Sequence, residues 1–199
     1  MRTKAILAGI AVLTAFGLQP AEAAPVTFTT ALGPEVPGAT GSGTATVVID
    51  TDANTLSIST AWSGLSGVTT VAHIHCCTAA PGVSTVGVAV TPGTLPGFPV
   101  GVTAGSYSIV LDTEALPTYT STFLNNTVFG GGGTLAGAEA ALLAGFRNGT
   151  AYLNIHSSAF TSGEIRGFLA EVPEPASAAL LGAGLLGLGV VGRRSRRAA

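Results

Sequence analysis

Hydrophobic and polar residues alternate along much of this chain, which is the pattern of β-strands with one buried face. Residues 44–50 and residues 55–62 each place their large apolar side chains on one face. The turn-forming sequence Thr51-Asp52-Ala53-Asn54 lies between them, so the two segments are predicted to form a hairpin. This hairpin places Ile49 opposite Leu56 and fixes which side chains share a face.

Five further segments show similar alternation or are rich in β-branched residues. They are residues 26–32, 68–75, 106–112, 150–156 and 164–169. Residues 135–146 are the one good helix prediction, because they are rich in alanine and have glycine before and near their end. Seven strands separated by turn residues predict an all-β fold. We expect an antiparallel β-sandwich, immunoglobulin-like or barrel-like, with one short helix.

The first 23 residues have the organisation of a secretory signal peptide. Arg2 and Lys4 precede the apolar residues 5–18, and Ala21-Glu22-Ala23 supplies small residues at the −3 and −1 positions. Cleavage by signal peptidase after Ala23 is therefore expected. The exported domain would then span residues 24–171.

The other end of the chain has the features of a membrane anchor. Pro173-Glu174-Pro175 is followed by the uncharged residues 176–192, which as a helix reach roughly 25 Å, the short end of what spans a bilayer. Four arginines come next, at Arg193, Arg194, Arg196 and Arg197. By the positive-inside rule they would stay in the cytoplasm and leave the domain outside. A transmembrane helix over residues 176–192 is therefore predicted.

These three features in this order closely resemble the PEP-CTERM sorting signal of Gram-negative bacteria. The resemblance implies that residues 172–199 hold the chain in the inner membrane until a membrane-embedded exosortase cuts near Pro-Glu-Pro. It further implies that the cut protein reaches the cell surface or the extracellular matrix.

Charge is scarce between the two ends and excludes one class of function. The exported segment has only two basic residues, Arg147 and Arg166, against eight acidic ones. Phosphate binding needs clustered lysine and arginine, so this segment is not a nucleic-acid-binding domain.

All three histidines fall in predicted strands. The two-residue period places His73 and His75 on one side of their strand, about 7 Å apart. Pairing residue 156 with residue 164 in the last hairpin places His156 opposite Glu164 and, one step along, Asn154 opposite Arg166. The last hairpin therefore places a carboxylate beside His156, while the strand period does not show whether His73 and His75 lie near them.

Two interpretations of these histidines stay open. In one, His73, His75 and His156 bind a divalent ion such as copper or zinc, and Glu164 is a fourth ligand or orients His156. In the other, they are structural polar residues, and Glu164 and Arg166 form a structural polar pair.

Cys76 and Cys77 directly follow His75, and three states are open to them. An exported protein favours a disulfide, which here would join neighbouring residues. The alternatives are a bridge between two chains and thiolate ligands for copper or zinc beside His75.

Two motifs resemble the CHRD domain, which is named for chordin. They are Ala72-His73-Ile74-His75 and, downstream, Tyr152-Leu153-Asn154-Ile155-His156 followed by Gly163-Glu164-Ile165-Arg166-Gly167. The likeness covers about residues 26–169. It implies an immunoglobulin-like or sandwich fold and a binding module rather than an enzyme.

The favoured function is a non-enzymatic structural or binding module of a bacterial surface or biofilm matrix, with a His-based metal site. The alternative is a copper- or zinc-dependent redox protein that uses the histidines with Cys76 or Cys77. Other matrix proteins or polysaccharide are further partners to weigh. Sugar binding would use Trp62, Tyr107 and Tyr119, whereas a core position is the simpler interpretation of Trp62.

Overall fold

The computed structural model describes residues 24–173. The predicted signal peptide, the membrane helix and the arginine cluster lie outside the described residues. The strands are β1 (Val26–Pro34), β2 (Ser42–Asp50), β3 (Thr55–Ser63), β4 (Thr69–His75), β5 (Val88–Val90), β6 (Gly105–Asp112), β7 (Tyr152–Ser157), β8 (Ile165–Phe168) and β9 (Ala170–Glu171). Helices are the 3₁₀ turn η1 (Leu116–Thr118), α1 (Ser121–Leu124) and α2 (Leu135–Arg147). Within residues 24–173, no helix combines the length and apolar character needed to cross a bilayer.

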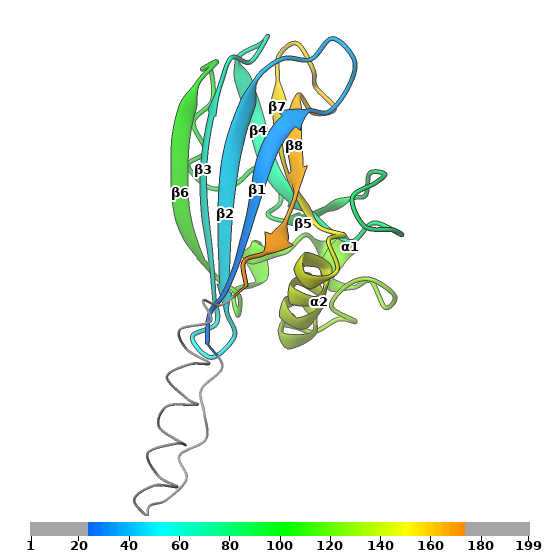
Figure 1. Cartoon of the computed structure of the whole chain (residues 1–199). Coiled ribbons are helices and arrows are strands. Elements are labelled where there is room, and N and C mark those ends of the chain that lie inside the picture. The colour runs from blue at the N-terminus through cyan, green and yellow to red at the C-terminus, as the bar shows by residue number, and fades with distance from the viewer. Residues whose placement is uncertain (1–23, 174–199) are drawn as a thin grey trace, which may run out of the picture.

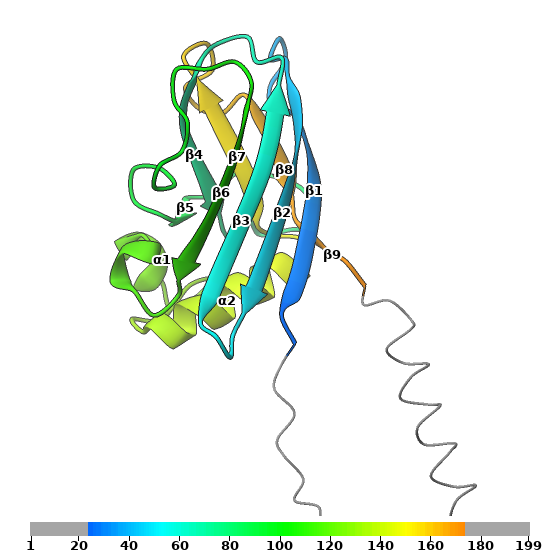
Figure 2. The ribbon, with the colours of Figure 1, turned by 90° about the vertical axis from the view of Figure 1, so that its left-hand side faces the viewer.

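The strands form one antiparallel sheet that curls on itself (Figure 1). Its order is β5-β4-β7-β8-β1-β2-β3-β6, and the short β9 also pairs with β1. Strand β1 joins the two halves, because it pairs with β2 over most of its length and with β8 at Gly33 and Pro34. Figure 2 shows the β6-β3-β2-β1 half in front of the β4-β7-β8 half. The all-β antiparallel prediction is confirmed.

The predicted sandwich or barrel needs a correction. All described strands belong to a single sheet, and that sheet stays open because β5 and β6 at its two ends each pair on one side only. Strand β5 was not predicted, since three residues are too short to show a period. The prediction of one short helix was also incomplete, because α1 and η1 are present besides α2.

Alternation fixes the register and the core. The β2–β3 ladder pairs Ile49 with Leu56 and Val47 with Ile58, as the hairpin prediction required. These side chains are at most 1% exposed and lie in one hydrophobic cluster with Ile155 from the other half of the sheet. Burying a large aliphatic side chain stabilises the fold by about 1.5–3 kcal/mol, so the alternating pattern drives the curl.

The three aromatic side chains considered for sugar binding belong to this core. Trp62 is 4%, Tyr107 9% and Tyr119 2% exposed. The Trp62 ring stacks on Phe98 with centroids 5.0 Å apart, and the Tyr107 hydroxyl donates to the Pro96 carbonyl. They therefore do not form an exposed platform, and sugar binding through them is not supported.

Helix α2 closes one end of the curled sheet (Figure 2). It begins where the Thr134 hydroxyl accepts a hydrogen bond from the Gly137 amide at 3.1 Å, which satisfies a free N–H of the first turn. Its Phe146 ring lies 5.1 Å from the Phe28 ring of β1. The helix predicted over residues 135–146 is confirmed, because α2 spans Leu135–Arg147. Its buried residues face the core.

Candidate metal centre

The outer face of the β4-β7-β8 half carries a regular array of polar and aromatic side chains. Strand β4 pairs with β7 so that His73 lies opposite Asn154 and His75 opposite Tyr152. His156 is the next residue of β7 on the same face as Asn154 and lies opposite Val71. The pairing of β4 with β7 therefore brings the third histidine to the His-x-His pair.

The three imidazoles converge. One ligand nitrogen from each of His73, His75 and His156 lies within 4.8 Å of the other two. The ring centroids are 5.8 Å apart for the first two, 5.3 Å for His73 and His156, and 6.4 Å for His75 and His156. This is the grouping that the metal interpretation needs.

Each histidine uses one ring nitrogen on a backbone carbonyl. The pairs are His73 Nε2 with Gly93 at 3.0 Å, His75 Nδ1 with Val86 at 2.7 Å, and His156 Nδ1 with Thr161 at 2.8 Å. A carbonyl only accepts, so these nitrogens carry a hydrogen, and in the neutral form of the ring the other nitrogen has a free lone pair. Those second nitrogens are buried and have no hydrogen-bond partner among residues 24–173. A carbonyl on the far nitrogen is how proteins orient metal-binding histidines.

The loops around β5 and after β7 supply these carbonyls. Gly93 follows Pro92 and has φ +83°, a conformation that a residue with a side chain rarely adopts. The turn places its carbonyl over β4, where His73 meets it. Sequence analysis did not identify these three groups, because a backbone carbonyl carries no residue-type signal.

Burial keeps the His73 and His75 rings neutral. Desolvation lowers the pKa of His75 to about 4, against the opposing effect of its hydrogen bond to Val86, and the nearby His73 and His156 lower it further. Desolvation is also the main cause that lowers the pKa of His73. A neutral imidazole is the form that binds a metal, so no proton has to leave these two rings at neutral pH.

The Tyr152 ring and the Arg166–Glu35 ion pair lie beside the histidine cluster. The Tyr152 ring stacks on His75 with centroids 4.7 Å apart and planes 3° from parallel. The Arg166 guanidinium lies 5.1 Å from the Tyr152 ring centroid and donates to the Ser84 carbonyl at 2.9 Å. It also lies 3.3 Å from the Glu35 carboxylate. His75 therefore packs against a ring that is itself held in place.

Glu164 does not join the histidines, which corrects the prediction of a fourth ligand. The regular β7–β8 ladder ends at Ile155 and Ile165, and the Glu164 amide donates to the Ile155 carbonyl. The predicted pairing of His156 with Glu164 is therefore one step beyond the ladder. The Glu164 carboxylate instead accepts hydrogen bonds from the backbone amides of Ser66 and Gly67.

The predicted polar pair of Glu164 with Arg166 is also corrected. Arg166 pairs with Glu35, a residue just beyond β1 that sequence analysis did not identify. Its signal was present only as a lone acidic residue between prolines. The contact exists because the end of β1 pairs with β8.

Glu164 has a structural role that predicts an acid-sensitive fold. Burial raises the pKa of its carboxyl, but hydrogen bonds from Ser157, Ser66 and Gly67 outweigh that effect and leave the pKa lowered. The carboxylate therefore stabilises the fold above the pKa it has in the unfolded chain, and this contribution is lost as the pH falls. Glu164→Gln is expected to lower the free energy of unfolding by about 1–2 kcal/mol at pH 7. The variant's free energy of unfolding is also expected to fall less steeply than that of the wild-type protein as the pH decreases.

Urea unfolding of both proteins between pH 7 and pH 3 checks this expectation. Glu114→Gln is a control, because that carboxylate is on the surface. Equal stability of the Glu164→Gln variant and the wild-type protein at pH 7 would contradict the assigned role.

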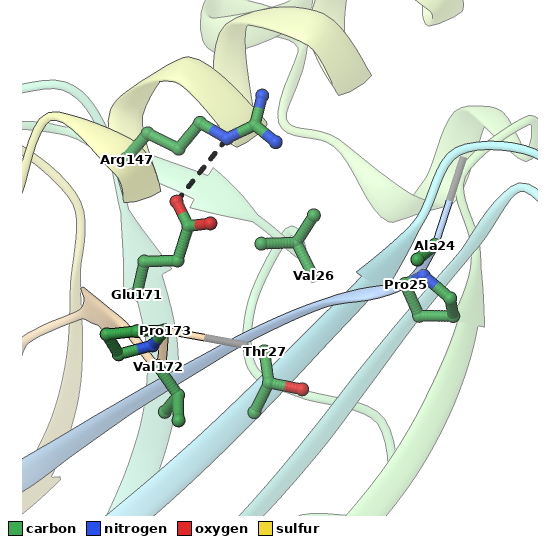
Figure 3. Close-up of a pocket in the computed structure, with 8 residues that line it drawn as sticks. All are labelled: Ala24, Pro25, Val26, Thr27, Arg147, Glu171, Val172 and Pro173. Atoms are coloured by element: carbon green, nitrogen blue, oxygen red, sulfur yellow. Dashed lines mark ion pairs between the residues drawn. The ribbon is translucent and has the colours of Figure 1, made fainter. Parts of the chain in front are cut away.

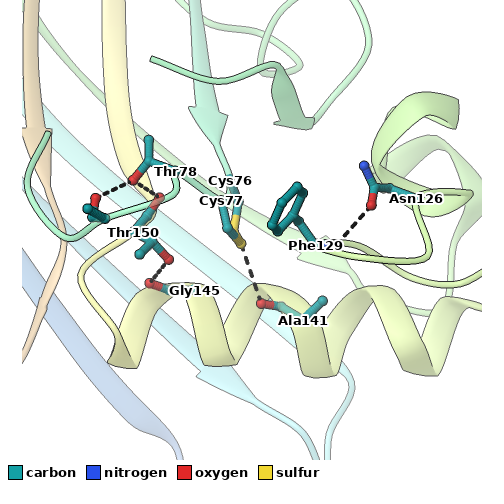
Figure 4. The surroundings of a disulfide bond; sticks show 9 residues. Cys76, Cys77, Thr78, Asn126, Phe129, Ala141, Gly145 and Thr150 are labelled. Atoms are coloured by element: carbon teal, nitrogen blue, oxygen red, sulfur yellow. Dashed lines mark hydrogen bonds between the residues drawn. A yellow bond between two sulfur atoms is a disulfide. The ribbon is translucent and has the colours of Figure 1, made fainter. Parts of the chain in front are cut away.

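Cys76 and Cys77, directly after β4, form a disulfide (Figure 4). Cys76 is 5% exposed and belongs to the hydrophobic core. Because both sulfurs are bonded, neither is a thiolate, and neither belongs to the group of converging ligand atoms. The structure therefore does not support cysteine ligands or a bridge between chains. The disulfide faces α2, where the Ala141 carbonyl lies 3.8 Å from Cys77 Sγ.

A surface pocket lies where both ends of the described chain leave the sheet (Figure 3). It has a volume of about 410 Å³ and is lined by residues 24–27, Arg147 and residues 171–173. The Val172 amide donates to the Thr27 carbonyl at 2.8 Å, and Arg147 Nε lies 3.5 Å from the Glu171 carboxylate. The chain is thus tied to β1 up to the residue before Pro173.

Comparison with known families agrees with this architecture. A family model described as the CHRD domain matches residues 26–169, and one described as the PEP-CTERM protein-sorting motif matches residues 171–197. Both resemblances inferred from the sequence are confirmed. Neither curated proteins nor solved structures give a significant match to the chain.

Proposed function

Because this chain belongs to the CHRD domain family and carries a PEP-CTERM motif, which implies export and surface sorting, we propose that it is a surface module that binds one copper or zinc ion. The ligands are His73, His75 and His156. The domain acts as a structural or binding module of the cell envelope or extracellular matrix, not as an enzyme.

One observation carries this proposal: His73, His75 and His156 each offer a ligand nitrogen within 4.8 Å of the other two, and each ring has one buried nitrogen without a hydrogen-bond partner among the described residues. A buried acceptor without a partner costs about 1–3 kcal/mol, and three together are costly unless something binds them. Imidazole is a ligand that suits both zinc and copper.

The distances between the ligand nitrogens show how far the rings must move to bind an ion. Nitrogens about 2.1 Å from a tetrahedral ion lie about 3.4 Å apart. The longest separation in the cluster must therefore shorten, by up to about 1.4 Å from the 4.8 Å limit. Small rotations of the three rings about their hydrogen bonds to Gly93, Val86 and Thr161 provide this movement.

Metal analysis tests the proposal directly. Protein purified and stripped with a chelator is titrated with Zn²⁺ and, separately, with Cu²⁺, and the bound metal is counted after desalting. We expect one ion per chain. Folded protein that retains neither ion would overturn the proposal.

The sorting signal supports a separate expectation about processing. The PEP-CTERM motif implies cleavage by an exosortase. Changing Pro173, Glu174 and Pro175 together to alanine is expected to leave uncut protein in the inner membrane, because the protease loses its recognition sequence. Fractionation and immunoblotting of producing cells check this result.

A matched control changes Thr27 and Arg147 to alanine, because both line the same surface pocket and lie outside residues 171–197 of the sorting motif. These residues lie at the junction described above but not within Pro-Glu-Pro. Normal release of the protein without Pro-Glu-Pro would contradict the expectation.

A further inference from the structure

Asn154 occupies the centre of the polar array on the outer face. It lies opposite His73 on one side and opposite Arg166 on the other. Along β7 its neighbours on the same face are His156 and Tyr152. Its side chain is therefore adjacent to the metal-binding cluster, although the side chain is not one of the three ligands.

The orientation of the Asn154 amide is fixed by Glu35. Its Nδ2 donates to the Glu35 carboxylate, and Arg166 holds that carboxylate from 3.3 Å. Glu35 follows the end of β1 that pairs with β8, so it reaches Asn154 from the β8 side. The histidines of β4 lie on the other side of β7. The amide nitrogen is therefore turned away from the cluster and the amide oxygen toward it.

That oxygen is a strong hydrogen-bond acceptor, and the described residues give it no donor. Asn154 is 1% exposed, and its Oδ1 has no hydrogen-bond partner among residues 24–173. The free nitrogens of the nearby His73 and His75 are acceptors too in the neutral rings, so these nitrogens have no hydrogen to offer it. A hydrogen donor that binds at the same centre would satisfy it.

We infer that Asn154 is a positioning residue that selects the fourth ligand of the ion and favours water. This inference rests on the proposed function. Three histidines leave one position of a tetrahedral ion open. Water in that position donates a hydrogen bond to Asn154 Oδ1, whereas an anion without a hydrogen places negative charge beside a carbonyl oxygen and leaves it unsatisfied.

Cobalt supplies a spectroscopic test. The full chain is loaded with Co²⁺, and its visible absorption spectrum is followed during titration with thiocyanate, an anion that has no hydrogen to donate. Asn154→Leu, of similar size and without an acceptor, is expected to bind thiocyanate about tenfold or more tightly than wild type. Both proteins are expected to hold one Co²⁺.

Two further variants make the result decisive. Glu35→Ala frees the amide to rotate and is expected to tighten thiocyanate binding less than Asn154→Leu does. Asn148→Leu makes the same change at an exposed amide beyond α2 and is expected to match wild type. If Asn154→Leu does not fold, Glu35→Ala alone decides, and wild-type thiocyanate affinity in that variant overturns the inference.

The outcomes separate this inference from the proposed function. One bound Co²⁺ with equal thiocyanate affinity in wild type, Asn154→Leu and Glu35→Ala overturns the role of Asn154 and leaves the metal site standing. Folded wild-type protein that binds no Co²⁺, Zn²⁺ or Cu²⁺ overturns both.

Discussion

Replacing His73 with alanine is expected to weaken copper or zinc binding by more than about 100-fold. Loss of a residue that only orients a metal ligand typically costs 10–100-fold in affinity, and loss of a ligand costs more. His73 is the most buried of the three histidines, and its ring lies within 6 Å of both others by centroid. Its removal leaves two nitrogens, too few for a stable site.

Isothermal titration with Zn²⁺, with metal counting after desalting, measures the effect. His156→Ala is expected to behave alike, because His156 supplies one of the three converging ligand nitrogens. Thr70→Ala is the matched control on β4, since that side chain is exposed. One ion retained with wild-type affinity in both histidine variants would show that these residues are structural.

Replacing Gly145 with alanine is expected to lower the free energy of unfolding by about 1–2 kcal/mol. A Cβ at this position of α2 would overlap Cys76 Sγ and lie 2.7 Å from Cys77 Sγ. Cys76 and Gly145 are both buried where they meet, so the added methyl group is not accommodated by turning toward solvent. Overpacking of this kind costs about 1–3 kcal/mol and occasionally more, and the better helix propensity of alanine recovers only about 1 kcal/mol.

A double-mutant cycle isolates the contact. Gly145→Ala is measured again in a protein in which Cys76 and Cys77 are both alanine, where the sulfur atoms are absent. The substitution is then expected to cost less than about 0.5 kcal/mol, because the clash is gone. Ala144→Gly, on the exposed side of the same helix, reports the propensity difference alone. An equal cost of Gly145→Ala in both backgrounds would contradict the packing seen in Figure 4.

The local parts of the fold could be predicted because their causes are local. Alternation identified β2 and β3, and the four-residue turn between them set their register, since the shortest connection leaves one pairing that buries Ile49 with Leu56. The same argument paired Asn154 with Arg166 in the last hairpin. It failed two residues further on, at Glu164, because the ladder ends where the loop's own hydrogen bonds begin.

The amino-acid sequence by itself established all the described strands except β5 and β9, the α2 helix, the family and the placement of His73 beside His75, because strand period and motif spacing are properties of neighbouring residues. Only the tertiary structure decided that β4 lies against β7, since burial of a shared core selects that pairing among strands far apart in the chain. That choice brings His156 to the other two imidazoles. The tertiary structure also decided which backbone carbonyls orient the three imidazoles. It decided as well that Glu35, remote in sequence, orients the Asn154 amide. Backbone groups and long-range contacts leave no pattern in the order of residues, so the sequence could not show either.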